Sequence, residues 1–251
     1  MSEYSSEEPL LEVRNLSKHF GAVQALSDFS MVVGPGEVVA LAGDNGAGKT
    51  TLIKAISGVY RPSSGEIRLR GEAVHFSTPQ EAREMGIETI YQDLALADNL
   101  SIGANIFLGR EPMTKVFGFL PVLDRKKMAE AARQTMALLD FHVSRMNAPV
   151  SNFSGGQRQA VAIGRAVYWN AQILIMDEPT AALGVPEQRK VISLIHQLKR
   201  QGRGVIFISH NLQDIFAVSD RIIVLRRGVR AGERKISETT HDEVVRLMVG
   251  G

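Results

Sequence analysis

The run Gly43-Asp44-Asn45-Gly46-Ala47-Gly48-Lys49-Thr50 restricts the fold of this chain more than any other feature of the sequence. It fits the pattern G-x-x-x-x-G-K-[ST], whose glycines let backbone N–H groups curl around phosphate oxygens without side-chain clashes. Lys49 adds a charge that can reach the β- and γ-phosphates, and the Thr50 hydroxyl can ligate Mg²⁺. The alternative is a Gly-rich turn. Because an apolar run precedes the motif and a helical pattern follows it, we expect a nucleoside triphosphate site.

Two carboxylates follow a second apolar run. Residues 173–176 read Ile-Leu-Ile-Met and lead into Asp177 and Glu178. A carboxylate at the carboxyl end of a buried strand can hold Mg²⁺ directly or through water, and its neighbour can polarise an attacking water. The alternative is that both residues only end a strand before the turn at Pro179. Beside a phosphate-binding loop, we interpret them as metal-binding and catalytic groups.

The apolar pattern along the chain predicts an α/β fold. Apolar runs without alternation at 37–42, 172–176 and 204–208 suit strands that are covered on both faces, as in a parallel sheet. A capping box at Thr78-Pro79-Gln80-Glu81 and a proline at 186 predict helix starts between them. Residues 92–154 lack a convincing buried strand, and their best element is a helix over 124–139. We therefore expect a helical insertion there.

Composition removes several classes of protein. The chain has no cysteine, which excludes a disulfide scaffold, a thiolate metal site and a cysteine nucleophile. Its 29 basic and 27 acidic residues are interleaved, which argues against a nucleic-acid partner. The acidic amino terminus has no apolar core typical of a signal peptide, and no run approaches the roughly 18 apolar residues of a membrane span. We expect an intracellular chain.

Several polar residues are weak signals when each is taken alone. The segment Ser154-Gly155-Gly156-Gln157, here called the SGGQ segment, precedes a helical pattern and can offer an anion a hydroxyl, N–H groups and a helix dipole. It can equally be an ordinary helix cap. Gln92 and His210 sit at predicted strand ends, where polar side chains are common. Phe20 before Gly21 can be a core or turn residue, and the basic stretch 225–235 reads as a solvated hairpin.

The order of these motifs resembles the nucleotide-binding subunit of ABC transporters, over roughly residues 10–230. The most specific segment beside the phosphate loop is 152–159, NFSGGQRQ, whereas the Asn/Thr-Lys-x-Asp motif of GTPases is missing. The resemblance implies a P-loop NTPase core with a mostly parallel sheet, an N-terminal antiparallel β region and a helical subdomain. The expected boundaries are 1–91 and 165–251 for the core and 92–164 for the helical subdomain that carries the SGGQ segment.

The resemblance also implies a role for each motif residue. Glu178 is similar to the general base, His210 to the histidine that contacts the γ-phosphate, and Gln92 to the glutamine that touches metal and water. The implied metal ligands are Thr50, Gln92 and Asp177. The implied nucleotide-binding residues are Phe20, which stacks on adenine, and Gly43, Asp44, Asn45, Gly46, Ala47, Gly48, Lys49, Thr50 and Thr51.

In this family Ser154, Gly155, Gly156 and Gln157 close over ATP bound to a partner's phosphate loop. One loop and one SGGQ segment per chain therefore imply an ATP-dependent, head-to-tail pair of identical chains. Two positions depart from the usual family pattern: Phe153 replaces a leucine, and Gly184 replaces the aspartate that helps to link the two sites.

A narrower resemblance concerns the transported solute. Four segments are similar to those of ATPases from bacterial monosaccharide importers of the ribose, xylose and fructose kind: Thr78–Arg83, Gly86-Ile87, Tyr91-Gln92 and Asn105–Glu111. A single cassette favours the homodimeric, fructose-type variant. The implied partners are a transmembrane permease and, indirectly, a periplasmic sugar-binding protein, with the ATPase peripheral at the cytoplasmic face of the inner membrane. The alternatives are an ABC-type ATPase acting on ribosomes or DNA, a non-hydrolysing regulatory module and an exporter ATPase.

Overall fold

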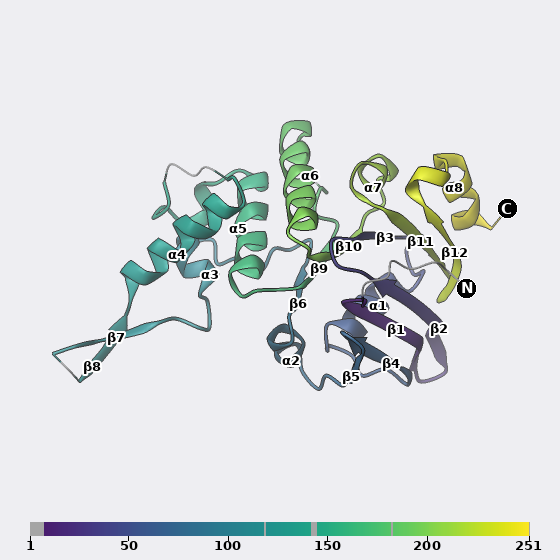
Figure 1. The fold of residues 1–251 in the computed structure, drawn as a ribbon, viewed down its shortest axis with the longest axis horizontal. Helices are drawn as coiled ribbons and strands as arrows, with labels where there is room; N and C mark the ends of the chain where they lie inside the picture. Colours follow the sequence, from purple (N-terminus) through teal and green to yellow (C-terminus); the bar gives the residue numbers. More distant parts are fainter. Residues whose placement is uncertain (1–7, 118, 142–144, 182, 251) are drawn as a thin grey trace. The chain divides into compact units, whose positions relative to one another are not determined.

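The computed structural model describes residues 8–117, 119–141, 145–181 and 183–250 (Figure 1). The amino-terminal residues 1–7 and Ala182 thus lie outside the described part. The chain divides into two compact units. The first comprises the chain up to Gln92, Ala171–Ala181 and the chain from Ile195, and the second comprises Asp93–Asn170 and Ala182–Leu194.

A six-stranded sheet forms the centre of the first unit, in the order β12-β11-β3-β10-β9-β6. All neighbours are parallel except β11 and β12. Every residue of β3 and β10 is buried, which explains why their sequences show no alternation. The strands are β3 (Val38–Ala42), β6 (Ile87–Ile90), β9 (Ile173–Asp177), β10 (Gly204–Ile208), β11 (Arg221–Arg226) and β12 (Val229–Lys235).

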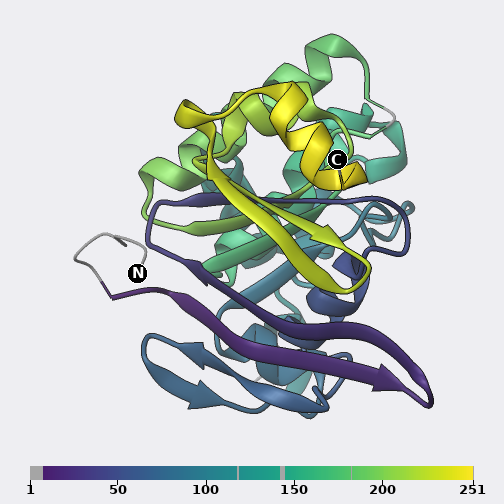
Figure 2. The same cartoon turned by 90° about the vertical axis from the view of Figure 1, so that its right-hand side faces the viewer.

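An antiparallel sheet, β2-β1-β4-β5, confirms the expected β region at the start of the chain (Figure 2). Its apolar side chains, Phe29 among them, share one buried cluster with residues of β3 and helix α1. Ala47 of the phosphate loop belongs to the same cluster. The remaining elements of the unit are β1 (Leu11–Phe20), β2 (Val23–Val33), β4 (Ser64–Leu69), β5 (Glu72–Val74), α1 (Lys49–Ile56), α2 (Pro79–Glu84), α7 (Leu212–Val218), η2 (Ile236–Glu238) and α8 (His241–Val249).

Helix α2 begins at the expected residue, but its capping box is only half formed. Thr78 Oγ1 accepts a hydrogen bond from the Glu81 N–H at 3.3 Å. The Glu81 carboxylate accepts from the N–H of Ser77, at 2.7 Å, and not from that of Thr78. The glutamate therefore reaches one residue further back than the motif requires, and it still satisfies an N–H ahead of the helix.

The second unit is mainly helical and contains one hairpin. Helix α4 matches the helix expected over 124–139, and α5 carries the SGGQ segment at its start. The sequence did not predict the hairpin, because both of its faces are exposed and its residues do not alternate. The elements are α3 (Ile102–Ile106), β7 (Met113–Val116), β8 (Leu120–Leu123), α4 (Arg125–Leu138), η1 (Val150–Asn152) and α5 (Gly155–Tyr168), and α6 (Val185–Arg200) begins here and ends in the first unit.

No helix in the described parts of the chain is long and apolar enough to cross a membrane.

Asn105 anchors the segment that follows Gln92 in the second unit. Its side chain is fully buried, and its amide donates to the carbonyls of Ala97, Leu100 and Ser101 at 3.1–3.2 Å. Its Oδ1 accepts from the Ala97 N–H at 2.7 Å. Both the oxygen and the nitrogen of the side-chain amide thus fix 97–101 against α3.

Asn105→Ala should therefore lower the free energy of unfolding by about 1–3 kcal/mol, because buried backbone groups lose their partners. Chemical denaturation measures the change. Asn99→Ala, an exposed amide on the same segment, is the control and should change stability by less than about 0.5 kcal/mol. Equal stability of Asn105→Ala and the parent chain would show that water replaces these bonds.

Candidate nucleotide-binding site

The phosphate loop connects β3 to α1 and depends on two glycines that other segments approach closely. A Cβ on Gly43, whose φ is 148°, would lie 2.3 Å from the carbonyl oxygen of Leu225. A Cβ on Gly48, whose φ is 109°, would lie 2.9 Å from the carbonyl oxygen of Ala25. Gly48 is also the N-cap of α1 and has no side chain to occupy the first N–H groups of the helix. Those groups and the helix dipole remain available to an anion.

Lys49 lies at the first position of α1, with its ammonium group turned back over the loop. Its Nζ donates to the carbonyl oxygen of Gly43 and, at 3.1 Å, to that of Asp44. Burial lowers the pKa of Lys49, and the nearby carboxylates of Glu178, Asp177 and Asp44 oppose this shift. The Lys49 ammonium is partly desolvated and bonds to two carbonyl oxygens. It can exchange these acceptors for phosphate oxygens, which form stronger, charge-assisted bonds with it.

The two carboxylates occupy the carboxyl edge of the parallel sheet. Asp177 ends β9 and Glu178 follows it with a left-handed φ of 52°. The Glu178 N–H donates to the carbonyl of Ile208 at 2.9 Å, which ties the turn to the end of β10. His210 stands two residues beyond that carbonyl, and its Nδ1 lies 2.9 Å from Glu178 Oε2. This is an ion-pair distance when the imidazole is protonated, although the two atoms are not aligned as a hydrogen bond.

Glu178 and His210 differ in their access to solvent. The Glu178 side chain is 18% exposed and that of His210 is 78% exposed. The carboxylate is therefore shielded at the base of the site, and the imidazole can reposition at its mouth. A shielded carboxylate that keeps one oxygen without an aligned donor can accept a proton from a bound water.

Asp177 carries a cost of burial that a substitution can remove. Burial, and secondly the charge of Glu178, raise its pKa, while Lys49 lowers it. A carboxyl whose pKa is raised in the folded chain destabilises the fold above that pKa, and the penalty disappears as the pH falls below its unfolded value.

Asp177→Asn should therefore raise the Tm of the ligand-free chain at neutral pH, by roughly 2–4 °C for each kcal/mol of penalty removed. The difference should shrink as the pH is lowered. Thermal unfolding across a pH series measures it, with the exposed Asp242→Asn as control. A variant that is less stable than the parent at neutral pH would show that Asp177 stabilises the empty site.

A cavity of about 940 Å³ in the first unit joins these groups. It brings together Phe20, Gln92, Asp177, Glu178 and His210 with most of the phosphate loop. Local patterns missed other lining residues, because backbone pairing of distant segments brings them here. The complete lining is Phe20, Val23, Gln24, Ala25, Asp44, Asn45, Gly46, Ala47, Gly48, Lys49, Thr50, Thr51, Gln92, Asp177, Glu178, Ala181, Ile208, His210, Arg227 and Gly228.

Phe20 lies at the end of β1, on the rim of the cavity, and is 42% exposed. Its ring meets that of Tyr60 edge to face, with centroids 5.2 Å apart, and the ammonium of Lys18 lies 5.1 Å from the Phe20 centroid. Tyr60 thus supports the aromatic side chain, a contact that no sequence motif indicated. An exposed ring held in this way can stack on a planar base.

The donor set of the cavity fits Mg²⁺. Thr50 supplies a hydroxyl and Asp177 a carboxylate, which are hard oxygen ligands. The described residues contain no group of three or more His, Asp or Glu side chains that could hold a metal by themselves. A Mg²⁺ ion would therefore be coordinated by these side chains together with phosphate oxygens of the nucleotide, as is usual for this cation.

The SGGQ segment belongs to the second unit and forms the start of α5. Ser154 Oγ accepts from the Gln157 N–H at 3.4 Å, and Gln157 Oε1 accepts from the Ser154 N–H at 3.0 Å. This is a complete capping box. A Cβ on Gly155 would lie 2.6 Å from Cδ2 of Leu183, the end of a flexible side chain that can move aside. The segment is a well-formed helix cap, and Ser154 is exposed.

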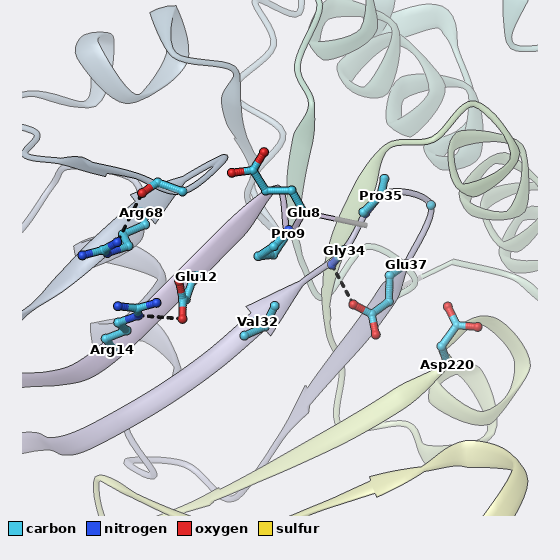
Figure 3. Close-up of a pocket in the computed structure, with 12 residues that line it drawn as sticks. Glu8, Pro9, Glu12, Arg14, Val32, Gly34, Pro35, Glu37, Arg68 and Asp220 are labelled. Carbon is cyan, nitrogen blue, oxygen red and sulfur yellow. Dashed lines mark hydrogen bonds and ion pairs between the residues drawn. The ribbon is translucent and has the colours of Figure 1, made fainter. Parts of the chain in front are cut away.

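A second cavity in the first unit, of about 610 Å³, lies beside the start of β1 (Figure 3). Several of its charged side chains have partners within the chain. Arg14 Nε lies 2.6 Å from Glu12 Oε1, and Glu37 Oε2 accepts from the Gly34 N–H at 2.7 Å. No residue assigned to the site from the sequence lines it.

Comparison with known proteins defines the class to which this fold and site belong. A family model described as ABC transporter matches residues 26–181. The chain belongs to the ABC transporter family, and within it the chain is an ATP-binding subunit, an ABC-type ATPase. A cassette crystallised in the ADP conformation has the same fold, with a TM-score of 0.82 and 24% identity over 98% of this chain and 100% of that one.

Two relatives resemble the chain over nearly its whole length. The xylose/arabinose import ATP-binding protein XylG of Sulfolobus acidocaldarius is 50% identical, covering 95% of this chain and 93% of its own. The fructose import ATP-binding protein FrcA of Rhizobium meliloti is 45% identical, covering 98% of this chain and 95% of its own. The family expected from the motif order is confirmed.

Proposed function

We propose that the chain hydrolyses Mg²⁺-ATP to power import of a monosaccharide through an ABC transporter. The convergence of Lys49, Asp177, Glu178 and His210 on one cavity carries the hydrolytic part of the proposal. The near full-length similarity to two sugar-import ATPases supports the transported class. The alternative action on ribosomes or DNA has no comparable support.

The cavity residues divide the work of phosphoryl transfer. The N–H groups at the start of α1 and the Lys49 ammonium hold the phosphates, and Phe20 takes the adenine. When bound, Mg²⁺ would be held by Thr50 and Asp177, with Gln92 beside it, and would neutralise charge on the phosphates. Glu178 accepts the proton of the water that attacks the γ-phosphorus, and His210 steadies the γ-phosphate at the mouth of the site.

The site requires a second copy of the chain in this proposal. In the family, the SGGQ segment completes the site of the partner, and this chain has one such segment and one phosphate loop. Two identical chains in head-to-tail arrangement therefore make two complete sites. Gly184 replaces the usual aspartate of the linking loop, so the two sites would be coupled without that carboxylate.

The candidate sugars follow from the sequence pattern and from the relatives. The sequence pattern ranks fructose first, whereas the 50% identical relative is named for xylose and arabinose. The match covers 93% of the xylose/arabinose relative and 95% of the fructose relative. A permease and an extracytoplasmic sugar-binding protein would select the solute, with this chain peripheral at the cytoplasmic face.

The proposal is tested by purifying the tagged chain from gently solubilised native membranes and identifying co-purifying proteins by mass spectrometry. A stoichiometric permease with many membrane spans is expected. Uptake of labelled fructose, xylose, arabinose and ribose, with and without the gene for this chain, then identifies the sugar. Recovery of ribosomal or DNA-repair proteins without a permease would overturn import in favour of the alternative.

A further inference from the structure

The hairpin β7–β8 exposes an unusual amount of apolar surface. Among the described residues it forms a sheet of two strands, and Figure 1 shows it extending away from the start of α4. Phe117 and Phe119, at its turn, are 86% and 77% exposed. Met113, Val116, Leu120 and Leu123 are exposed as well. An isolated hairpin is only marginally stable. An exposed apolar patch of this kind marks a surface that binds another protein or a membrane.

The cross-strand register places the apolar residues on both faces. Val116 pairs with Leu120, and Thr114 with Val122, on one face. Met113 pairs with Leu123, and Lys115 with Pro121, on the other. Neither face is therefore the polar, solvent-facing side that an ordinary surface hairpin presents. The two phenylalanines extend this apolar surface to the tip.

Basic side chains surround the base of the hairpin. Residues 110–127 contain five basic and two acidic side chains, a net charge of +3. The Asp124 carboxylate accepts from the Lys127 N–H, and the Glu111 carboxylate accepts from the Gly109 N–H, so backbone amides engage both acids. The cations with no carboxylate partner in the described part of the chain are Lys115, Arg125, Lys126 and Lys127, all exposed.

We propose that this hairpin inserts its apolar tip into the interface of an anionic lipid bilayer while its basic base binds the headgroups. An apolar wedge backed by Lys and Arg is the chemistry of peripheral membrane binding. Two proteins could cover the hairpin instead, a permease or a second copy of this chain. The positive charge of the hairpin favours anionic lipid over both. Cytoplasmic loops of membrane proteins carry excess Lys and Arg, which repel a basic hairpin, and a second copy would bring the same positive charge.

This contact goes beyond the proposed function, since it needs neither sugar nor permease. The test is sedimentation of the full chain with vesicles of phosphatidylglycerol and phosphatidylcholine, or of phosphatidylcholine alone. We expect binding to the anionic vesicles only. The double variant Phe117→Ser, Phe119→Ser should bind at least about tenfold more weakly, because it removes two apolar side chains from the interface. The control is Val245→Ser, Val249→Ser, two exposed apolar residues on α8, with unchanged binding.

A second pair of variants tests the charge. Each basic residue near an anionic surface contributes about fivefold to binding, so Arg125→Gln, Lys126→Gln should weaken it by about 25-fold. Arg189→Gln, Lys190→Gln, exposed on α6, is the charge-matched control. ATP hydrolysis in solution by the serine variant should equal that of the parent.

Four results would overturn the proposal, and three of them are measured with vesicles. The first is that the parent chain fails to bind anionic vesicles, and the second is that it binds neutral vesicles equally well. The third is that the serine variant keeps full vesicle binding. If that variant loses co-purification with the permease instead, the hairpin is a protein contact and the lipid assignment is wrong. The vesicle results do not bear on sugar uptake, so the two proposals fail separately.

Discussion

Glu178→Gln is expected to lower steady-state ATP turnover by a factor of about 10²–10⁴, the range that a general base contributes. The amide keeps the size of the side chain but cannot accept the proton of the attacking water. ATP binding should persist, because the phosphate loop is untouched. Phosphate release under saturating Mg²⁺-ATP measures turnover, and nucleotide binding is measured separately.

The matched control is Glu84→Gln, an exposed glutamate on α2, which should hydrolyse ATP at the parent rate. With ATP bound and hydrolysis blocked, the Glu178 variant should accumulate as a dimer, visible as a doubled mass by light scattering. Turnover within a few-fold of the parent would place the base on another residue. Loss of turnover without any dimer would support Glu178 as the general base and contradict the head-to-tail dimer.

Lys49→Ala is expected to weaken ATP binding by about 10–150-fold, the equivalent of one charge-assisted hydrogen bond of about 1.5–3 kcal/mol. Hydrolysis should fall further, because the same ammonium also offsets charge that develops on the transferring phosphate. Isothermal calorimetry with ATP measures the affinity. The Tm shift that Mg²⁺-ATP induces in the parent chain should shrink accordingly.

Lys54→Ala, on the same helix, is the control, because Lys54 lies 5.3 Å from the Tyr60 ring centroid and does not line the cavity. It should bind ATP within a few-fold of the parent. The ligand-free Tm of each variant reports whether the fold is intact. Equal ATP affinity for Lys49→Ala and the parent would show that the helix N-terminus alone holds the phosphates.

Local chemistry made part of this protein predictable from its sequence. The fully buried strands β3 and β10 show uninterrupted apolar runs, and this established the α/β fold that the structure confirms. The phosphate loop lies within eight consecutive residues, so its glycines and lysine reveal it without tertiary information. The order of the motifs led to the correct family.

Other features depend on segments that are far apart in the chain. Gly43 must be a glycine because the carbonyl of Leu225 packs against it. Arg227 lines the cavity, although its basic stretch read as a solvated hairpin. The β7–β8 hairpin was missed because neither of its faces is buried, and a strand without a buried face has no alternation to detect.

The sequence by itself determined the residue types that can bind phosphate, metal and water, since each motif is local and its chemistry belongs to its side chains. Only the tertiary structure decided that Glu178 and His210 form one site. They follow different strands, and it is the parallel pairing of β9 with β10, with Asp177 opposite Ile208, that brings their side chains within 2.9 Å. The register of β9 against β10 is set by burial of apolar residues over the whole sheet, and no local motif encodes it.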